Sequence, residues 1–425
     1  MDVNSPGTSG RTALFYAAAH VNPSIATRLG NVAGVDVNAA DEDGTTPLLI
    51  AIACGNLDVV RALLRLPGLD VSDGRSDSDI TPLMLAAHNN LIRVTAGEAD
   101  DDELEVDLET RVAIIRALVA ADRLDPNRRN TPQRRTALMH AVRHDEPPEI
   151  VRELLAARGV DVNLRDHNGF TALGTAMRLG EVALTRLLWD VEGIDRGTDD
   201  ALLLAAEGGH ASLTRWLLSS SDTARAELER QDGSGATALH KAASNEDLDV
   251  LRVLLEACIR VGVQVGALRD REGRTVLMTA AIDGLTTVVR ELVAMLQRAR
   301  VDPMYNARDS KGRTALVYAS RRGHAETVLA LLDARGIDPN VADPTSGRTA
   351  LMYAASRGQA EAVQRLLAFR EIDLGATDSK GKTAEDLAIE GRESYPNRFT
   401  EIARMLRTAA AEREVSPRSV RQRVG

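Results

Sequence analysis

The sequence predicts a mainly α fold, an elongated and curved solenoid of helix–turn–helix units joined by short β-hairpin loops. Two observations predict it. A Gly-x-Thr-Ala-Leu block recurs along the chain at intervals that are mostly 34 to 39 residues, and a period of this size is typical of repeat architectures. Aromatic residues make up only 3% of the 425 residues. The apolar content is therefore mainly Ala, Leu and Val, which suits closely packed helices better than one large globular core.

The threonine of this block marks the start of each unit. The markers are Thr12, Thr46, Thr81, Thr136, Thr171, Thr237, Thr275, Thr314, Thr349 and Thr383. The long gap between Thr171 and Thr237 holds a degenerate unit, DDALLLAAEGGHASLTRWLL at 199–218, which brings the total to about eleven. The hairpin that precedes this unit is shortened, so we expect a looser joint near 195–200.

Each unit has a physical interpretation. The glycine before the marker permits a turn with positive φ, and the Thr hydroxyl caps a short first helix with an Ala-rich packing face. A second glycine ends that helix, and a second helix follows with apolar residues at helical spacing, as at Val59, Val60, Leu63 and Leu64. A single helix pair leaves its apolar faces uncovered, so the units must stack on their neighbours. In the most regular part of the stack, Leu351 and Leu366 should be buried.

These motifs resemble the ankyrin repeat. Good examples are GTTPLLIAIACGNLDVVRALL at 44–64 and GATALHKAASNEDLDVLRVLL at 235–255, and the resemblance covers roughly residues 8 to 411. It differs from the usual pattern in having Ala after most marker threonines and in lacking the Gly-x-Thr hairpin in the sixth unit. The resemblance implies a binding surface on the hairpins and first helices rather than an active site.

We expect three segments. Residues 1–198 form an N-terminal stack of repeats one to five, with an acidic insertion near 93–111. Residues 199–411 form a C-terminal stack of repeats six to eleven, and 412–425 form a disordered tail. The densest part of the insertion, GEADDDELEVDLE at 97–109, is expected to be a surface loop, serving either as a docking loop or as a tolerated insertion.

Residue patterns for catalysis, metals or cofactors are absent from the sequence. It contains no His-Glu-x-x-His, Cys-x-x-Cys or Gly-x-Ser-x-Gly. The resemblance implies that His140, His210, His240 and His324 bridge neighbouring loops by hydrogen bonds. Cys54 and Cys258 should be reduced thiols buried in helices. We therefore predict a chain that is not an enzyme and has no catalytic residues, metal or cofactor.

The main candidate site is a stripe of basic residues. The residue before the marker threonine is Arg or Lys at positions 11, 135, 274, 313, 348 and 382, and the resemblance places it on the inner, concave side. Further arginines follow the first helices of repeats nine and ten. The candidate partner-binding residues are Arg274, Arg313, Arg321, Arg322, Arg348, Arg357 and Lys382. Such a band suits an acidic segment, although it also fits a solvated face.

The predicted function is a non-catalytic scaffold or adaptor that binds an acidic protein segment on repeats eight to eleven. The alternative is binding of nucleic acid or anionic lipid through the same arginines, which the net charge of −10 makes unfavourable. The start, MDVNSPGTSG, has no apolar signal core, and no apolar run reaches the length of a membrane span. We expect a soluble cytoplasmic monomer, and the basic end SPRSVRQRVG leaves a nuclear location open.

Overall fold

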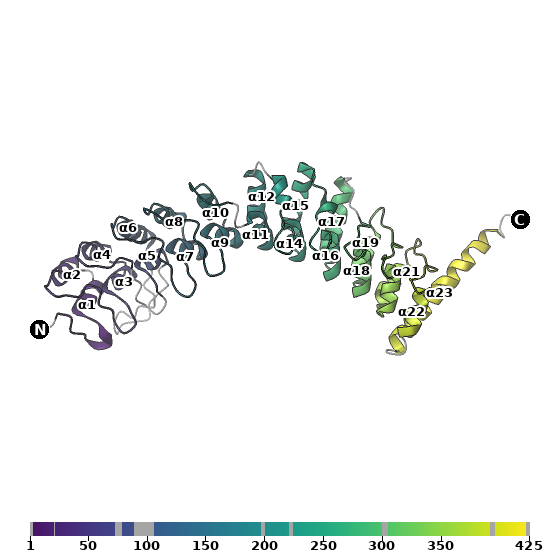
Figure 1. Ribbon diagram of the computed structural model, residues 1–425, viewed down its shortest axis with the longest axis horizontal. Helices are drawn as coiled ribbons and strands as arrows, with labels where there is room; N and C mark the ends of the chain where they lie inside the picture. The colour runs from purple at the N-terminus through teal and green to yellow at the C-terminus, as the bar shows by residue number, and fades with distance from the viewer. Residues whose placement is uncertain are drawn as a thin grey trace. The chain divides into compact units, whose positions relative to one another are not determined.

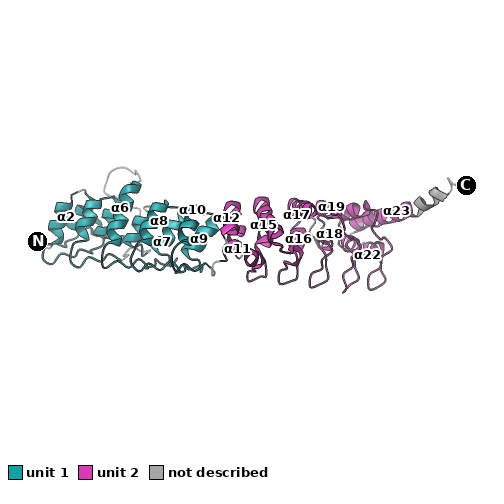
Figure 2. Ribbon diagram, turned by 90° about the horizontal axis from the view of Figure 1, so that it is seen from above, with its two compact units in different colours: residues 1–201 teal, residues 202–425 magenta. Residues whose placement is uncertain are grey.

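The chain is a series of helix pairs that divides into two compact units, residues 1–201 and 202–425 (Figure 2). The structure is a computed structural model that describes residues 3–20, 22–72, 79–88, 106–196, 200–220, 224–299, 305–391 and 396–421. These residues form α-helices and connecting turns with no β-strand among them; one isolated antiparallel bridge joins Arg269 and Thr275. The predicted hairpins are therefore mostly closed turns rather than strand pairs.

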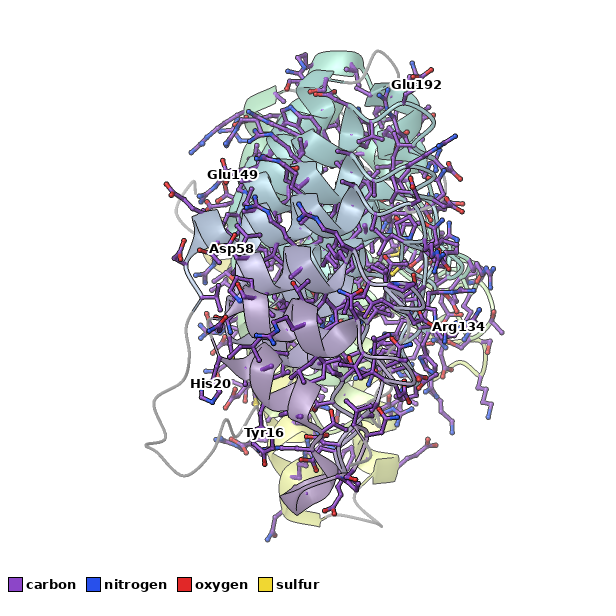
Figure 3. All side chains as sticks on the ribbon, turned by 90° about the vertical axis from the view of Figure 1, so that its left-hand side faces the viewer. Tyr16, His20, Asp58, Arg134, Glu149 and Glu192 are labelled. Atoms are coloured by element: carbon purple, nitrogen blue, oxygen red, sulfur yellow. The ribbon has the colours of Figure 1, made fainter. Side chains whose placement is uncertain are left out.

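Unit 1 contains five helix pairs, drawn as two rows in Figure 1. The first helices are α1 (Ala13–Ala19), α3 (Pro47–Ala53), α5 (Pro82–Ala87), α7 (Ala137–Arg143) and α9 (Ala172–Leu179). The second helices are α2 (Pro23–Gly30), α4 (Leu57–Leu63), α6 (Leu108–Val119), α8 (Pro148–Leu155) and α10 (Val182–Trp189). Each first helix packs on the next first helix, and each second helix on the next second helix. Viewed along the stack, Arg134 in a hairpin lies on the opposite side from Asp58 and Glu149 of the second helices (Figure 3).

Unit 2 follows the same plan. Its first helices are α11 (Ala201–Glu207), which begins at the boundary, α14 (Ala238–Ser244), α16 (Val276–Asp283), α18 (Ala315–Arg322), α20 (Ala350–Ser356) and α22 (Ala384–Gly391). Its second helices are α12 (Ala211–Ser220), α15 (Leu248–Val261), α17 (Thr286–Ala299), α19 (Ala325–Leu332), α21 (Ala360–Leu367) and α23 (Pro396–Arg421). Unit 2 also has a short extra helix, α13 (Ala224–Glu229), and a 3-10 turn, η3 (Val265–Ala267); a further 3-10 turn, η1 (Thr8–Gly10), lies at the start of unit 1. The mainly α solenoid predicted from the sequence is confirmed.

The marker threonines cap the first helices, as the sequence predicts. The side chain accepts a hydrogen bond from the third backbone N–H of the helix at Thr12, Thr46, Thr81, Thr136, Thr171, Thr275, Thr314 and Thr349. In the last unit, Thr383 caps its helix with help from Asp386, whose carboxylate accepts from the Thr383 N–H and hydroxyl. Each such cap satisfies a helix N–H that has no partner within the helix.

The core runs between the two rows of helices. In repeat ten, the side chains of Leu351 and Leu366 are 1% and 0% exposed, which confirms the expected burial. Both cysteines are free thiols; Cys258 is buried, whereas Cys54 is only half-buried. Burial raises the pKa of both thiols, that of Cys258 to about 12.

Asparagines tie successive loops together. In each case the side-chain amide donates to a backbone carbonyl of the next loop, and its oxygen accepts a backbone N–H from that same loop. The residues are Asn4, Asn38, Asn127, Asn163, Asn306 and Asn340. These bonds fix the spacing of loops that have no sheet to hold them.

Helix α23 extends into the segment that the sequence predicts to be a disordered tail. The helix continues to Arg421, and Arg413 donates hydrogen bonds to the carbonyls of Leu367, Phe369 and Ile372 at the end of repeat ten. Arg413 thus supplies partners for carbonyl groups that a helix end leaves open. Residues 422–425 lie outside the described residues.

Two other sequence features fall partly outside the described residues. Residues 89–105, which include most of the acidic insertion predicted near 93–111, are not described. The part that follows contains Asp107, which caps α6 through the Thr110 N–H. The C-terminal end of the predicted insertion therefore belongs to the second helix of repeat three. At the joint expected near 195–200, residues 197–199 are likewise not described.

Candidate functional site

Neighbouring hairpins are joined by a recurring pair between an arginine and an aspartate. The arginine before the marker threonine reaches Oδ2 of the aspartate that starts the next hairpin. The Nε-to-Oδ2 distances are 3.3 Å for Arg11–Asp41, 3.6 Å for Arg135–Asp166 and 3.2 Å for Arg348–Asp378. The three carboxylates are almost fully buried, and their Oδ1 atoms accept backbone N–H groups of their own turns, as at Asp41. Three basic residues before the marker are therefore already neutralised by a buried carboxylate.

Tyrosines replace the arginine in this pairing at repeats nine and ten. The Tyr318 hydroxyl donates to Oδ2 of Asp309, and the Tyr353 hydroxyl donates to Oδ2 of Asp343, which also accepts from the Ser346 hydroxyl. Each tyrosine lies four residues after its marker threonine. In the hairpins where Arg and Asp do pair, this position is filled by Ile50, Thr175 or Leu387. A tyrosine at this position thus occupies the oxygen that the preceding arginine would otherwise contact.

As a result, Arg313 has no carboxylate partner among the described residues. The Tyr318 hydroxyl occupies Oδ2 of Asp309, in its own hairpin, and the Tyr353 hydroxyl occupies Oδ2 of Asp343, in the next hairpin. The Arg313 guanidinium lies 5.9 Å from the centre of the Tyr318 ring and interacts with both tyrosine hydroxyls. The ring and the hydroxyls hold the guanidinium without neutralising its charge.

Arg321 and Arg357 lie beside Arg313, and we call these three residues the arginine cluster. Arg321 follows Tyr318 by one helical turn on α18, and Arg357, the C-cap residue of α20, follows Tyr353 by about one turn. The pKa of Arg321 is lowered, first by burial and then by the positive charges of Arg313 and Arg357. Within the described part of the chain, no carboxylate lies within 4.0 Å of any of the three guanidinium groups. The cluster is therefore a concentration of unneutralised positive charge.

The other predicted stripe residues differ from the cluster. Arg274 pairs with Asp270 at 2.6 Å and with Glu272 at 3.0 Å, and Arg348 pairs with Asp378. Lys382 pairs with Glu390. Arg322 is exposed at the end of α18. Of the seven candidates, the structure brings three together as unpaired charges and gives three others a carboxylate.

Tyr318 and Tyr353 were not among the site residues predicted from the sequence. Their signal is visible in the sequence, because tyrosine stands four residues after the marker in two consecutive repeats, each next to an arginine-rich helix end. The pairing that the tyrosines interrupt becomes apparent only when the hairpin aspartates are located in space.

A second cluster lies in unit 1, between the ends of α5 and α6 and the next helix pair. Nδ1 of His88 lies 2.7 Å from Oε1 of Glu146, and Nη2 of Arg111 lies 2.9 Å from Oε2 of the same carboxylate. The His88 ring stacks on that of His144 with the centroids 3.8 Å apart. The pKa of Glu146 is lowered: burial opposes the shift, but the hydrogen bond to His88 and the charge of Arg111 outweigh it. Glu146 thus contacts one side chain on each side of the segment 89–105, which lies outside the described residues.

His140 differs from the bridging role that the resemblance implies. Both ring nitrogens are buried and have no hydrogen-bond partner among the described residues. Burial, followed by the charge of Arg135, lowers the pKa of His140 to about 3. The bridging role is confirmed for His240, which contacts Thr237 and the Arg274 carbonyl, and for His324, which contacts the Ile282 carbonyl. His140 is instead a neutral ring that packs parallel to His144.

The described residues contain neither a metal-binding cluster nor a membrane-spanning helix. No set of three or more His, Cys, Asp or Glu side chains is arranged to hold a metal ion. No described helix has both the length and the apolar character needed to span a bilayer.

Comparison with known proteins agrees with the fold. The family model for ankyrin repeats (3 copies) matches residues 1–75, 109–200, 183–265, 258–343 and 335–413. Among curated proteins, mouse ankyrin repeat domain-containing protein 63 is 37% identical over 118 residues, which is 26% of this chain and 30% of the relative. Mouse protein fem-1 homolog A-like is 32% identical over 104 residues, covering 24% of this chain and 14% of the relative. Human inversin is 27% identical over 196 residues, covering 46% of this chain and 18% of the relative.

The chain thus spans less than a third of the length of each of these relatives. The family model, in contrast, matches most of the chain and follows the same helix pairs that the structure contains. On this evidence the chain belongs to the ankyrin-repeat family.

Proposed function

We propose that this chain is a non-catalytic scaffold or adaptor that binds an acidic segment of a protein partner on repeats eight to eleven. Ankyrin repeats are protein-interaction modules, and the helices here are held by caps, asparagines and buried leucines. A preorganised surface of this kind loses little conformational freedom when it binds. We further propose that the chain acts as a monomer in the cytoplasm or the nucleus.

One observation carries the proposal: the arginine cluster has no carboxylate partner among the described residues, although the chain has more acidic than basic residues. In the recurring Arg–Asp pairs, an aspartate of the next hairpin neutralises the positive charge of the arginine. Around Arg313 it remains available to an external anionic group. Charge complementarity of this kind raises association rates and selects partners.

The proposed site is narrower than the stripe predicted from the sequence. Arg274, Arg348 and Lys382 border it, but their charges are largely compensated. We expect these three residues to contribute less to binding than Arg313, Arg321 and Arg357.

The test is capture of a partner by the tagged full chain in a lysate of its source cell, using an amine-reactive crosslinker. Lys311 and Lys380 stand in the hairpins that flank the cluster and report contacts there. One variant changes Arg313, Arg321 and Arg357 to Glu. The matched control changes Arg260, Arg335 and Arg370 to Glu, which alters the net charge equally at exposed positions at or beyond the ends of second helices.

A protein that crosslinks near Lys311 with the wild type and the control, but not with the cluster variant, is the expected result. Capture that survives in the cluster variant contradicts the proposed site. Capture that disappears after nuclease treatment, or binding to anionic vesicles that depends on the cluster, supports nucleic acid or lipid binding instead.

A further inference from the structure

We infer that the arginine cluster binds a phosphorylated serine or threonine side chain of the partner segment. This inference rests on the proposed function and deepens it, because it names the chemical group that the site recognises.

The number of charges favours phosphate over carboxylate. A carboxylate carries one negative charge and two oxygens, which satisfy one guanidinium in a bidentate pair. A phosphate monoester carries a charge of about −1.5 to −2 at neutral pH and three acceptor oxygens. Arg313, Arg321 and Arg357 lie close enough for their charges to act on one another. A phosphate therefore has more charge and more acceptor oxygens than one carboxylate with which to engage several of these guanidinium groups at once.

The tyrosines hold the cluster in place. Tyr318 and Tyr353 are fixed at their hydroxyl ends by Asp309 and Asp343, which are 7% and 2% exposed. The aspartates in turn accept backbone N–H groups of the hairpins. Arg313 rests against the Tyr318 ring and interacts with both hydroxyls, so its guanidinium loses little side-chain freedom on binding an anion.

Carboxylates lie behind the arginine cluster and in the repeats that precede and follow it. Asp309 and Asp343 lie behind the tyrosines and are hydrogen-bonded to them. In repeat eight, the exposed Asp283 stands where Arg322 stands in repeat nine, and in repeat eleven Glu390 is paired with Lys382. Acidic side chains thus border the cluster in repeats eight and eleven, and Arg398 of α23 adds one more positive charge beside it by donating to the Gly358 carbonyl. A site bordered in this way suits a single anionic side chain better than a long polyanion.

The experiment compares three peptide pools by fluorescence anisotropy with the full chain. Each pool is labelled with fluorescein and has random residues on both sides of a central residue, which is phosphoserine, glutamate or serine. The proteins are the wild type, Arg313→Gln, Arg321→Gln, Arg357→Gln and, as a control with an already paired arginine, Arg274→Gln. Tyr353→Phe is a further variant, because it keeps every arginine but removes one of the two hydroxyl donors to Oδ2 of Asp343, which lets Arg313 pair with that oxygen. Melting temperatures of all variants verify folding.

The phosphoserine pool should bind at least about tenfold more tightly than the glutamate pool, and each cluster variant should lose about tenfold of that affinity. Arg274→Gln should change it less than about twofold, and Tyr353→Phe should weaken it severalfold. Equal affinity for the phosphoserine and glutamate pools, both dependent on Arg313, overturns the phosphate inference and leaves the proposed function standing. If none of the three arginine variants changes the affinity for the peptides, both the phosphate inference and the proposed function are wrong. Inorganic phosphate that binds as tightly as the phosphoserine pool overturns the assignment to a peptide side chain.

Discussion

The hydroxyl of Tyr353 donates to Oδ2 of Asp343, the oxygen that a preceding arginine contacts in other hairpins of this chain. This hydrogen bond determines which partner is left for Arg313. Arg313 stands 30 positions before Asp343, as Arg348 does before Asp378 and Arg11 before Asp41, yet it lacks the pair that those two arginines form. Because tyrosine stands at position 353, Arg313 lacks the carboxylate that neutralises Arg11 and Arg348.

The regular core of repeat ten should tolerate truncation poorly. Leu351→Ala and Leu366→Ala each remove a side chain that is at most 1% exposed. We expect each to lower the free energy of unfolding by about 2–5 kcal/mol in urea denaturation. Ile389→Ala, at a position 37% exposed, is the control and should cost much less. A loss below about 1 kcal/mol at either leucine would show that the site is not packed as described.

His140 should make the chain less stable in mild acid. Its folded pKa of about 3 lies below the unfolded value of 6.5. Below pH 6.5 the unfolded chain therefore binds a proton that the folded chain does not, and stability falls as the pH drops toward 3. His140→Leu should flatten this dependence by about 1.4 kcal/mol per pH unit. The exposed His20 provides the control, and an unchanged slope in His140→Leu would contradict the buried, neutral state.

The two thiols should react at different rates. Cys258 is buried and its pKa is raised to about 12, whereas Cys54 is half-buried with a pKa raised by burial. Since the thiolate is the reactive form, Ellman's reagent should modify Cys54 first and leave Cys258 unmodified until the chain unfolds. Cys54→Ser and Cys258→Ser variants assign the two phases. Fast reaction of Cys258 in the native chain would mean that α15 opens readily.

Most of the fold could be predicted because each repeat contains the same local sequence signals. The marker threonine caps a helix, as at Thr314, and glycine supplies the left-handed turn, as at Gly312 with φ of 74°. At Gly312 a Cβ atom would also collide with the Pro344 ring of the next hairpin. Repetition makes such local signals reliable, since a chance match at one position does not recur at the next.

The candidate site could be predicted only in part. The sequence shows that arginines recur before the marker, but it does not show which of them a hairpin aspartate neutralises. That depends on contacts about 30 residues apart, such as Arg348–Asp378, and on the residue four positions after each marker. The stacked histidines at 88 and 144 were missed for the same reason, because the insertion separates them in sequence and only the fold brings them together.

The most direct test of the role of Tyr353 is a double-mutant cycle between Tyr353→Phe and Arg313→Gln, followed by urea denaturation of the full chain. In the wild type, Arg313→Gln should lower the free energy of unfolding only slightly, because Arg313 contacts the Tyr318 ring and two hydroxyls but no carboxylate among the described residues. In the Tyr353→Phe background, Arg313 gains Asp343 as a partner, and its loss should then cost about 1 kcal/mol. A coupling energy of that size supports the conclusion that Tyr353 keeps the Arg313 charge free for a partner. Strictly additive effects would contradict it.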